Sequence, residues 1–157
     1  MNTNWGCVKD CNAALPVSPG VKPAGRISQR VRAKARPDDG LQLVGTAITN
    51  AVRCVPPENK PVGAEIATCR GFLVPTIARF PRLRAVLALG SIAHQSTVRA
   101  LGGRVAAYPF KHGGRLEAGP VTLFSSYHCS RYNTNTGVLT EAMFVRVFSD
   151  IAEFLRT

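Results

Sequence analysis

The sequence predicts an α/β fold, arranged as three layers (α/β/α) around a short parallel sheet. From residue 38 onward, short apolar runs alternate with stretches whose apolar residues recur at helical spacing. Strands that alternate with helices favour right-handed crossovers and a parallel sheet covered on both faces. A length of 157 residues is enough for one domain with its own core. No apolar run approaches the ~18 residues that a bilayer span requires, so no membrane partner is expected.

The first half of the chain contains one clear helix. Residues 1–37 have seven Lys and Arg, one acid and no clear periodicity, so this segment is expected to be poorly ordered. Residues 46–50 are expected to be the end of a strand. The prolines within 54–61 exclude both a helix and a central strand there. A helix is predicted over 61–80, because its apolar residues fall on one side.

The second half is patterned more regularly. Residues 84–90 are a short apolar run ended by glycine, which is typical of a buried strand. A helix is predicted at 92–101 and a third strand at 120–126. The last helix has apolar residues at every fourth position, with Thr136 or Thr140 as its N-terminal cap.

The net charge of +11 favours a polyanionic partner, most often nucleic acid. Residues 1–37 contribute six of these charges, seven basic less one acidic. The five cysteines are an odd number and follow no secretory signal. Metal ligands or buried thiols therefore fit better than a disulfide framework, and a cytoplasmic location is expected.

Polar residues follow the predicted strands where each one ends. Ligands of parallel α/β sheets bind beyond the carboxyl ends of the strands. In this chain those ends lead to Asn50, Gly90 and residues 127–131. We therefore expect Asn50 and His128 to face one cleft.

Four blocks of sequence resemble a known family: ITNAVRCVPPENKP (48–61), VLALGSIAH (86–94), YPFKHGG (108–114) and SSYHCSRYNTNTG (125–137). Together and in this order they resemble the uracil-DNA glycosylase superfamily, specifically its type-5 branch, the B-type enzymes of bacteria and archaea that carry an iron–sulfur cluster. The resemblance implies a DNA repair hydrolase. Such an enzyme flips uracil, or another deaminated base, out of DNA and hydrolyses its N-glycosidic bond in base-excision repair.

The resemblance implies that His128 is catalytic and that Asn50 recognises the base. Bond cleavage leaves an oxocarbenium-like sugar and a uracil anion, which a hydrogen-bond donor at a pyrimidine carbonyl stabilises. A neutral imidazole is sufficient for this. The carboxamide of Asn50 offers one donor and one acceptor, which suit the adjacent carbonyl and N–H of uracil but not of cytosine. The alternative for Asn50 is that it only ends a strand.

The loop after His128 resembles the part of the family that holds DNA. The residues concerned are Ser130, Arg131, Tyr132 and Asn133. An arginine can bind a phosphate with two hydrogen bonds, a serine can donate its hydroxyl, and a tyrosine can stack or act as a wedge. The alternative is a helix-entry loop that serves only to cap a helix. Two further histidines lie in matching blocks. His94 is interpreted as a packed or surface residue and His112 as a loop residue.

Cys54 and Cys69 match two ligands of the family's [4Fe–4S] cluster, which normally has four thiolates. Cys7 and Cys11 are the candidates for the other pair, although their C-x-x-x-C spacing departs from the expected C-x-x-C-P. Without the resemblance, two cysteines fifteen positions apart indicate buried thiols. A small zinc protein that uses Cys54, Cys69 and a histidine is a further alternative.

The chain departs from the family at its beginning. The family's first motif, of the GLAP sort, supplies a water-positioning acid and an aromatic that stacks on the base, and residues 1–37 contain nothing similar. We therefore expect a non-family segment, 1–37, followed by the C-terminal part of a glycosylase-like domain, 38–157, with a fold incomplete at the N-terminus. The alternative to an active enzyme is a non-catalytic DNA-binding fragment. The expected form is a monomer at the nucleoid of a prokaryotic cell.

Overall fold

The structure is a computed structural model that describes residues 45–53 and 60–157. The predictions for the basic segment and for Cys7, Cys11 and Cys54 lie outside the described residues. The chain divides into two compact units, Met1–Thr49 and Asn50–Thr157. The fold given below is that of the second unit.

The centre of this unit is a three-stranded sheet in the order β1-β3-β2. Its strands are β1 (Ala85–Leu89), β2 (Gly114–Ala118) and β3 (Val121–Ser126). β1 runs parallel to β3, with Leu89 opposite Ser126. β2 runs antiparallel to β3. β3 is therefore the central strand, and all of its residues are buried.

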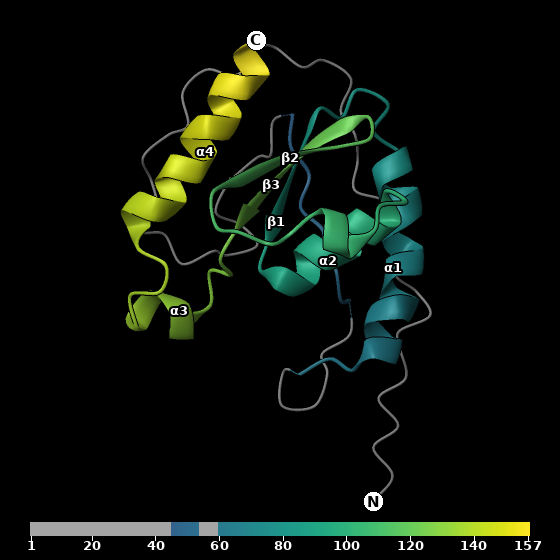
Figure 1. The fold of residues 1–157 in the computed structure, drawn as a ribbon, viewed down its shortest axis with the longest axis horizontal. Helices are drawn as coiled ribbons and strands as arrows, with labels where there is room; N and C mark the ends of the chain where they lie inside the picture. Colours follow the sequence, from purple (N-terminus) through teal and green to yellow (C-terminus); the bar gives the residue numbers. More distant parts are fainter. Residues whose placement is uncertain (1–44, 54–59) are drawn as a thin grey trace, which may run out of the picture. The chain divides into compact units, whose positions relative to one another are not determined.

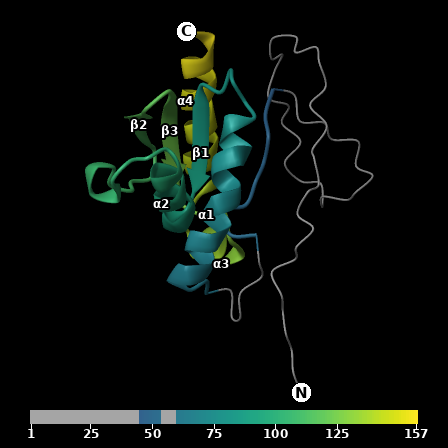
Figure 2. The same cartoon turned by 90° about the vertical axis from the view of Figure 1, so that its right-hand side faces the viewer.

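Helices cover both faces of the sheet. They are α1 (Gly63–Ala78), α2 (Ser91–Ala100), the short α3 (Arg131–Asn135) and α4 (Glu141–Arg156), with a 3₁₀ turn, η2 (Val105–Ala107), after α2. Figure 1 and the turned view in Figure 2 show α1 and α2 on one side of the sheet and α4 on the other. The predicted α/β/α arrangement is confirmed.

The sheet is mixed, whereas a parallel sheet was predicted. Gly119 has a φ of 65°, which lies in the left-handed region that glycine adopts readily, and it turns the chain between β2 and β3. A turn this tight can join only antiparallel neighbours, because parallel strands need a long crossover. β2 has five residues with alternating burial, too short a pattern to recognise in the sequence.

The two faces of the sheet pack differently. One buried cluster lies between the sheet and α2 and consists of Ala88, Val98, Ala118 and Leu123. Successive side chains of a strand point to opposite faces, so Phe124 faces the other way. Its ring centroid lies 5.6 Å from that of Phe154 on α4. β3 thus anchors a helical layer on each side.

Two boundary predictions had different outcomes. The hydroxyl of Thr140 accepts a hydrogen bond from the Met143 N–H at 3.2 Å, which confirms Thr140 as the cap of α4. The strand predicted for 46–50 is wrong, since these exposed residues are not part of a strand. A strand needs a hydrogen-bonded neighbour, and the sheet of the described residues pairs only β1, β2 and β3. None of the helices described could cross a membrane.

Candidate active site

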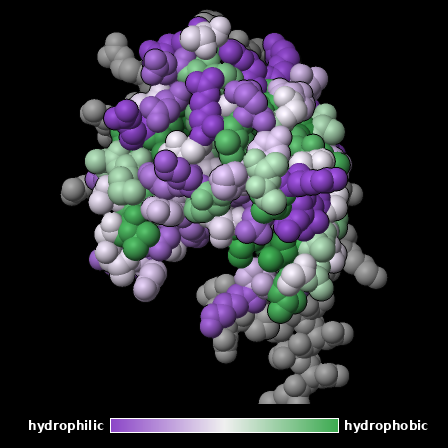
Figure 3. Space-filling model, in the orientation of Figure 1, coloured by the Kyte–Doolittle hydropathy of each residue, from purple (hydrophilic) through white to green (hydrophobic). Residues whose placement is uncertain are grey.

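The carboxyl ends of β1 and β3 meet at one edge of the sheet. Just beyond this edge, the Gly90 N–H donates to the Ser126 carbonyl at 2.8 Å. Gly90 leads into α2, and Tyr127 and His128 lead toward α3. The space-filling view is indented on this side of the molecule, between α3 and the N-terminal end of α1 (Figure 3). Of the three groups predicted to lie beyond the strand ends, Gly90 and residues 127–131 therefore do lie together.

His128 lies directly against Gly90. A β-carbon added to Gly90 would be 3.2 Å from the His128 Cβ and 3.8 Å from its ring. The φ of Gly90 is 92° and its ψ is 164°, a combination that is essentially restricted to glycine. Glycine is needed here both for the backbone and for the space, and the exposed His128 side chain extends from this contact toward solvent.

The loop after His128 is fixed by two of its predicted DNA-binding residues. Ser130 caps α3, and its hydroxyl accepts from the Asn133 N–H at 3.3 Å. The Asn133 side chain donates to the His128 carbonyl at 2.8 Å, which ties the helix back to the site. Arg131 and Tyr132 are exposed, Tyr132 to 74%. The capping alternative therefore accounts for Ser130 and Asn133 and leaves Arg131 and Tyr132 available to a ligand.

His112 supports the strand end beneath His128, a role that was not predicted. Its Nδ1 accepts from the Tyr127 N–H at 3.1 Å. The two rings are stacked, with centroids 4.9 Å apart. Because Nδ1 accepts, the proton of the neutral ring is on Nε2. No sequence signal indicates this bond, since its donor is a backbone amide.

His94 is a core residue, as expected. Its side chain is fully buried. One ring nitrogen, Nε2, donates to the Tyr108 carbonyl at 2.7 Å, and Nδ1 accepts from the Ser125 hydroxyl at 2.8 Å. Both nitrogens are occupied by the protein, which leaves neither for a substrate.

Asn50 is exposed and is joined through Ala51 and Val52 to Arg53, a stretch referred to as the Asn50 segment. The Arg53 N–H donates to the Cys69 Sγ at 3.4 Å. The Arg53 side chain donates from Nη2 to Thr76 Oγ1 at 3.1 Å and lies over the Phe72 ring, 5.2 Å from its centroid. The segment is thus attached to α1. That Asn50 and His128 share one cleft stays a prediction.

Cys69 fits the chemistry of a cluster ligand. It is buried on α1, and its sulfur accepts a backbone N–H, the kind of hydrogen bond that tunes cluster-bound thiolates. No group of three or more His, Cys, Asp or Glu that could hold a metal ion occurs within the described part of the chain. Cys69 is the one predicted ligand that lies in it.

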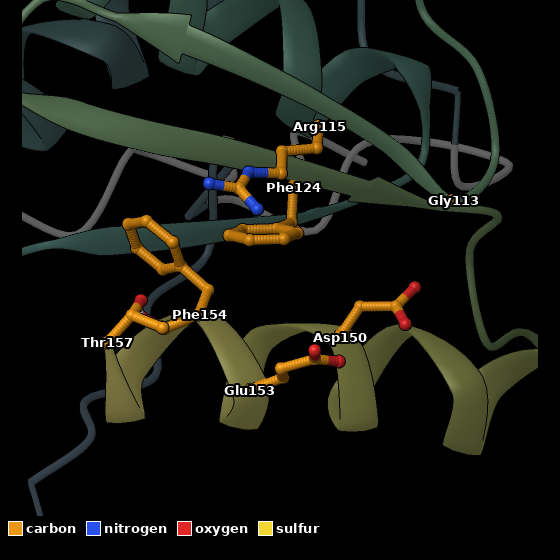
Figure 4. Close-up of a pocket in the computed structure, with 7 residues that line it drawn as sticks. All are labelled: Gly113, Arg115, Phe124, Asp150, Glu153, Phe154 and Thr157. Carbon is orange, nitrogen blue, oxygen red and sulfur yellow. Dashed lines mark hydrogen bonds between the residues drawn. The ribbon is translucent and has the colours of Figure 1, made fainter.

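A separate cavity of about 300 Å³ lies between the sheet and α4 (Figure 4). The Arg115 guanidinium lies over the ring of Phe154, 4.6 Å from its centroid, and over Phe124 at 5.8 Å. The carboxylates of Asp150 and Glu153 also line the cavity. None of the predicted site residues contributes to it.

Comparisons with known proteins agree with the blocks in the sequence. Residues 19–152 match the family model described as Uracil DNA glycosylase superfamily. Over 115 residues the chain is 41% identical to a type-5 uracil-DNA glycosylase of Thermus thermophilus, a match that covers 73% of this chain and 52% of that protein. It is 42% identical over 103 residues to a type-5 uracil-DNA glycosylase of Pyrobaculum aerophilum. That match covers 66% of this chain and 44% of that protein.

The type-5 uracil-DNA glycosylase of Mycobacterium leprae is 41% identical over 118 residues, with 71% of this chain and 50% of that protein covered. The chain thus spans about half the length of the relatives it matches. The family match begins at residue 19, within the segment 1–37 that was expected to lie outside the family. The boundary at residue 37 stays a prediction.

Proposed function

Because the chain belongs to the uracil-DNA glycosylase superfamily, we propose that it acts in excising uracil from DNA as part of base-excision repair. The observation that carries this proposal is the packing of His128 against Gly90, where the parallel strands β1 and β3 end. Ligands of α/β folds bind at such an edge. The names of the matched relatives supply the substrate, uracil in DNA.

In this proposal His128 donates a hydrogen bond to a carbonyl oxygen of the flipped uracil. Negative charge develops there as the N-glycosidic bond breaks, so the bond to the donor strengthens in the transition state. The backbone carbonyl of His128 accepts from the Asn133 side chain, and its Cβ lies where a β-carbon on Gly90 would meet it. Fixing the backbone from which the donor extends lowers the cost of orienting it during the reaction.

Asn50 reads the base in the same proposal. Its carboxamide pairs with the adjacent carbonyl and N–H of uracil and rejects cytosine, which has an acceptor in place of that N–H. Arg131 and Tyr132 contact the DNA, since both are exposed beside His128. Ser130 and Asn133 hold the loop in the conformation that presents them.

The proposed cofactor is a [4Fe–4S] cluster held by Cys69 and Cys54, with Cys7 and Cys11 as candidates for the remaining positions. The cluster would cross-link distant segments of the chain and would supply no step of the hydrolysis. Analysis of the purified protein for iron, sulfide and zinc tests this assignment. Iron and sulfide with broad visible absorption support the cluster, whereas stoichiometric zinc in a colourless sample supports the zinc alternative.

The decisive experiment is an excision assay on an oligonucleotide with one uracil, in which alkali cleaves the abasic product. Product formation supports the enzyme. Binding without product supports the second candidate, a non-catalytic DNA-binding chain. That candidate is favoured by one feature of the sequence, the lack of a GLAP-like first motif. Loss of a general base typically costs about 10²–10⁴-fold in rate, so long incubations at high enzyme concentration are required.

We place this activity in a single copy of the chain at the nucleoid of a prokaryotic cell. The relatives that it matches come from bacteria and an archaeon. Size-exclusion chromatography with and without a uracil-containing duplex tests whether the chain is a monomer, both free and bound to DNA.

A further inference from the structure

Arg53 makes three contacts with one helix. Its backbone N–H donates to Cys69, its guanidinium donates to Thr76, and the same guanidinium lies over the ring of Phe72. All three partners belong to α1. They hold the backbone and the side chain of Arg53 at once, so Arg53 has little freedom to move.

Asn50 lies three positions before Arg53, the residue that is held in this way. Three residues of extended chain span at most about 10 Å, so a fixed Arg53 limits where the Asn50 carboxamide can lie. Asn50 is exposed and therefore lacks the packing that would fix it locally. Recognition by one donor and one acceptor requires a definite position, because a displacement of about 1 Å can cost 10²-fold in rate.

We propose that Arg53 is a positioning residue that attaches the Asn50 segment to α1 and thereby sets the place of the base-reading amide. The inference rests on the proposed base-reading role of Asn50. Arg53 is half-buried, and its guanidinium is directed to Thr76 and Phe72 on α1.

Hydrogen–deuterium exchange of the full-length protein tests the attachment without reference to activity. Arg53→Ala is expected to raise the exchange rate of the backbone amide at position 53, which donates to the Cys69 Sγ, about tenfold, since the opening free energy of a segment falls when its contacts are lost. Thr76→Val removes the acceptor of the Arg53 guanidinium, together with a hydroxyl that donates to the Phe72 carbonyl, and is expected to raise exchange of the same amide by a smaller factor. Unchanged exchange in Arg53→Ala would overturn the proposal.

Two controls match these variants on the same helix. Thr68→Val removes a hydroxyl that donates to the Ala64 carbonyl at 3.0 Å, just as Thr76 donates to the Phe72 carbonyl at 2.7 Å. Arg79→Ala removes an exposed arginine next to the end of α1. Neither control is expected to change exchange of the amide at position 53. Faster exchange there in a control would mean that helix destabilisation, not the attachment, is being measured.

A double-mutant cycle then tests positioning. Arg53→Ala is expected to lower kcat/KM for uracil excision about tenfold and to relax discrimination against cytosine. In the Asn50→Ala background the same substitution is expected to have no further effect, because there is no amide left to position. Additive losses, or a shallower salt dependence of DNA binding in Arg53→Ala, would overturn the positioning role. Absence of excision by the unsubstituted chain would refute the proposed function, while the exchange experiment would still decide the attachment.

Discussion

The β-carbon of His128 is so close to Gly90 that a β-carbon on Gly90 would lie 3.2 Å from it. The two residues are 38 positions apart in the sequence and meet because β1 and β3 are parallel neighbours. Gly90 is also the N-cap of α2, at a backbone conformation essentially restricted to glycine. The strand end, the helix start and the proposed catalytic imidazole are therefore coupled at this one glycine.

The first prediction concerns Gly90→Ala. The new methyl group meets the His128 Cβ, and the backbone conformation costs of the order of 1–3 kcal/mol for a residue other than glycine. We expect a lower melting temperature and, in addition, slower uracil excision. The control is Gly102→Ala, which also has a positive φ, 80°, but has no atom within 4 Å of the added carbon. If Gly90→Ala and Gly102→Ala lose the same amount of stability and the same amount of activity, the idea that Gly90→Ala displaces His128 is refuted.

The second prediction concerns the imidazole itself. His128→Ala is expected to slow single-turnover excision about 10²–10³-fold, the usual effect of removing one transition-state donor. His128 is exposed, so the melting temperature and DNA affinity are expected to stay unchanged. His128→Gln keeps an N–H donor and is expected to recover part of the rate. An unchanged rate in His128→Ala would remove His128 from the mechanism.

The third prediction concerns the support beneath the site. His112→Phe keeps a ring against Tyr127 but removes the acceptor for the Tyr127 N–H. A half-buried donor without a partner costs about 1–3 kcal/mol, which urea denaturation should measure as a lower midpoint. Lys111→Ala changes the exposed neighbouring residue and is expected to leave the midpoint unchanged. Equal midpoints for His112→Phe and the unsubstituted protein would mean that water replaces the imidazole.

Sequence patterns predicted the elements whose burial repeats regularly. β3 is wholly buried and includes Val121, Leu123 and Phe124, and α4 has both a regular apolar side and a threonine cap, so each has a long or specific signal. β2 has five residues and was not predicted. The strand predicted for 46–50 shows the opposite limit, because strand-forming residues indicate that a segment can be a strand but not that a neighbour is present.

For the candidate site, the sequence predicted which residues meet but not the contacts that support them. The rule that parallel strands end at a common edge predicted that Gly90 and His128 would lie together. The two supports of the site, His112 with the Tyr127 amide and Arg53 with Cys69, each involve a backbone N–H. Such a donor is present at every residue except proline, so sequence letters cannot indicate which one is used.

The fourth prediction concerns DNA binding by Arg131. This residue is exposed beside His128, at a loop whose shape Ser130 and Asn133 maintain. If it contacts a phosphate, Arg131→Ala weakens binding of DNA with and without uracil alike and reduces the slope of log K against log salt by about one. Fluorescence anisotropy at several salt concentrations measures both quantities.

The control for Arg131→Ala must remove the same charge from another exposed place. Arg146 on α4 has 81% of its side chain exposed and pairs with Asp150 in the same helix at 3.5 Å. Arg146→Ala is expected to leave the slope unchanged, because Arg146 is paired with Asp150 and is not among the predicted DNA-binding residues. Equal changes in both variants would mean that net charge alone attracts the DNA, and Arg131 would then have no specific contact with a phosphate.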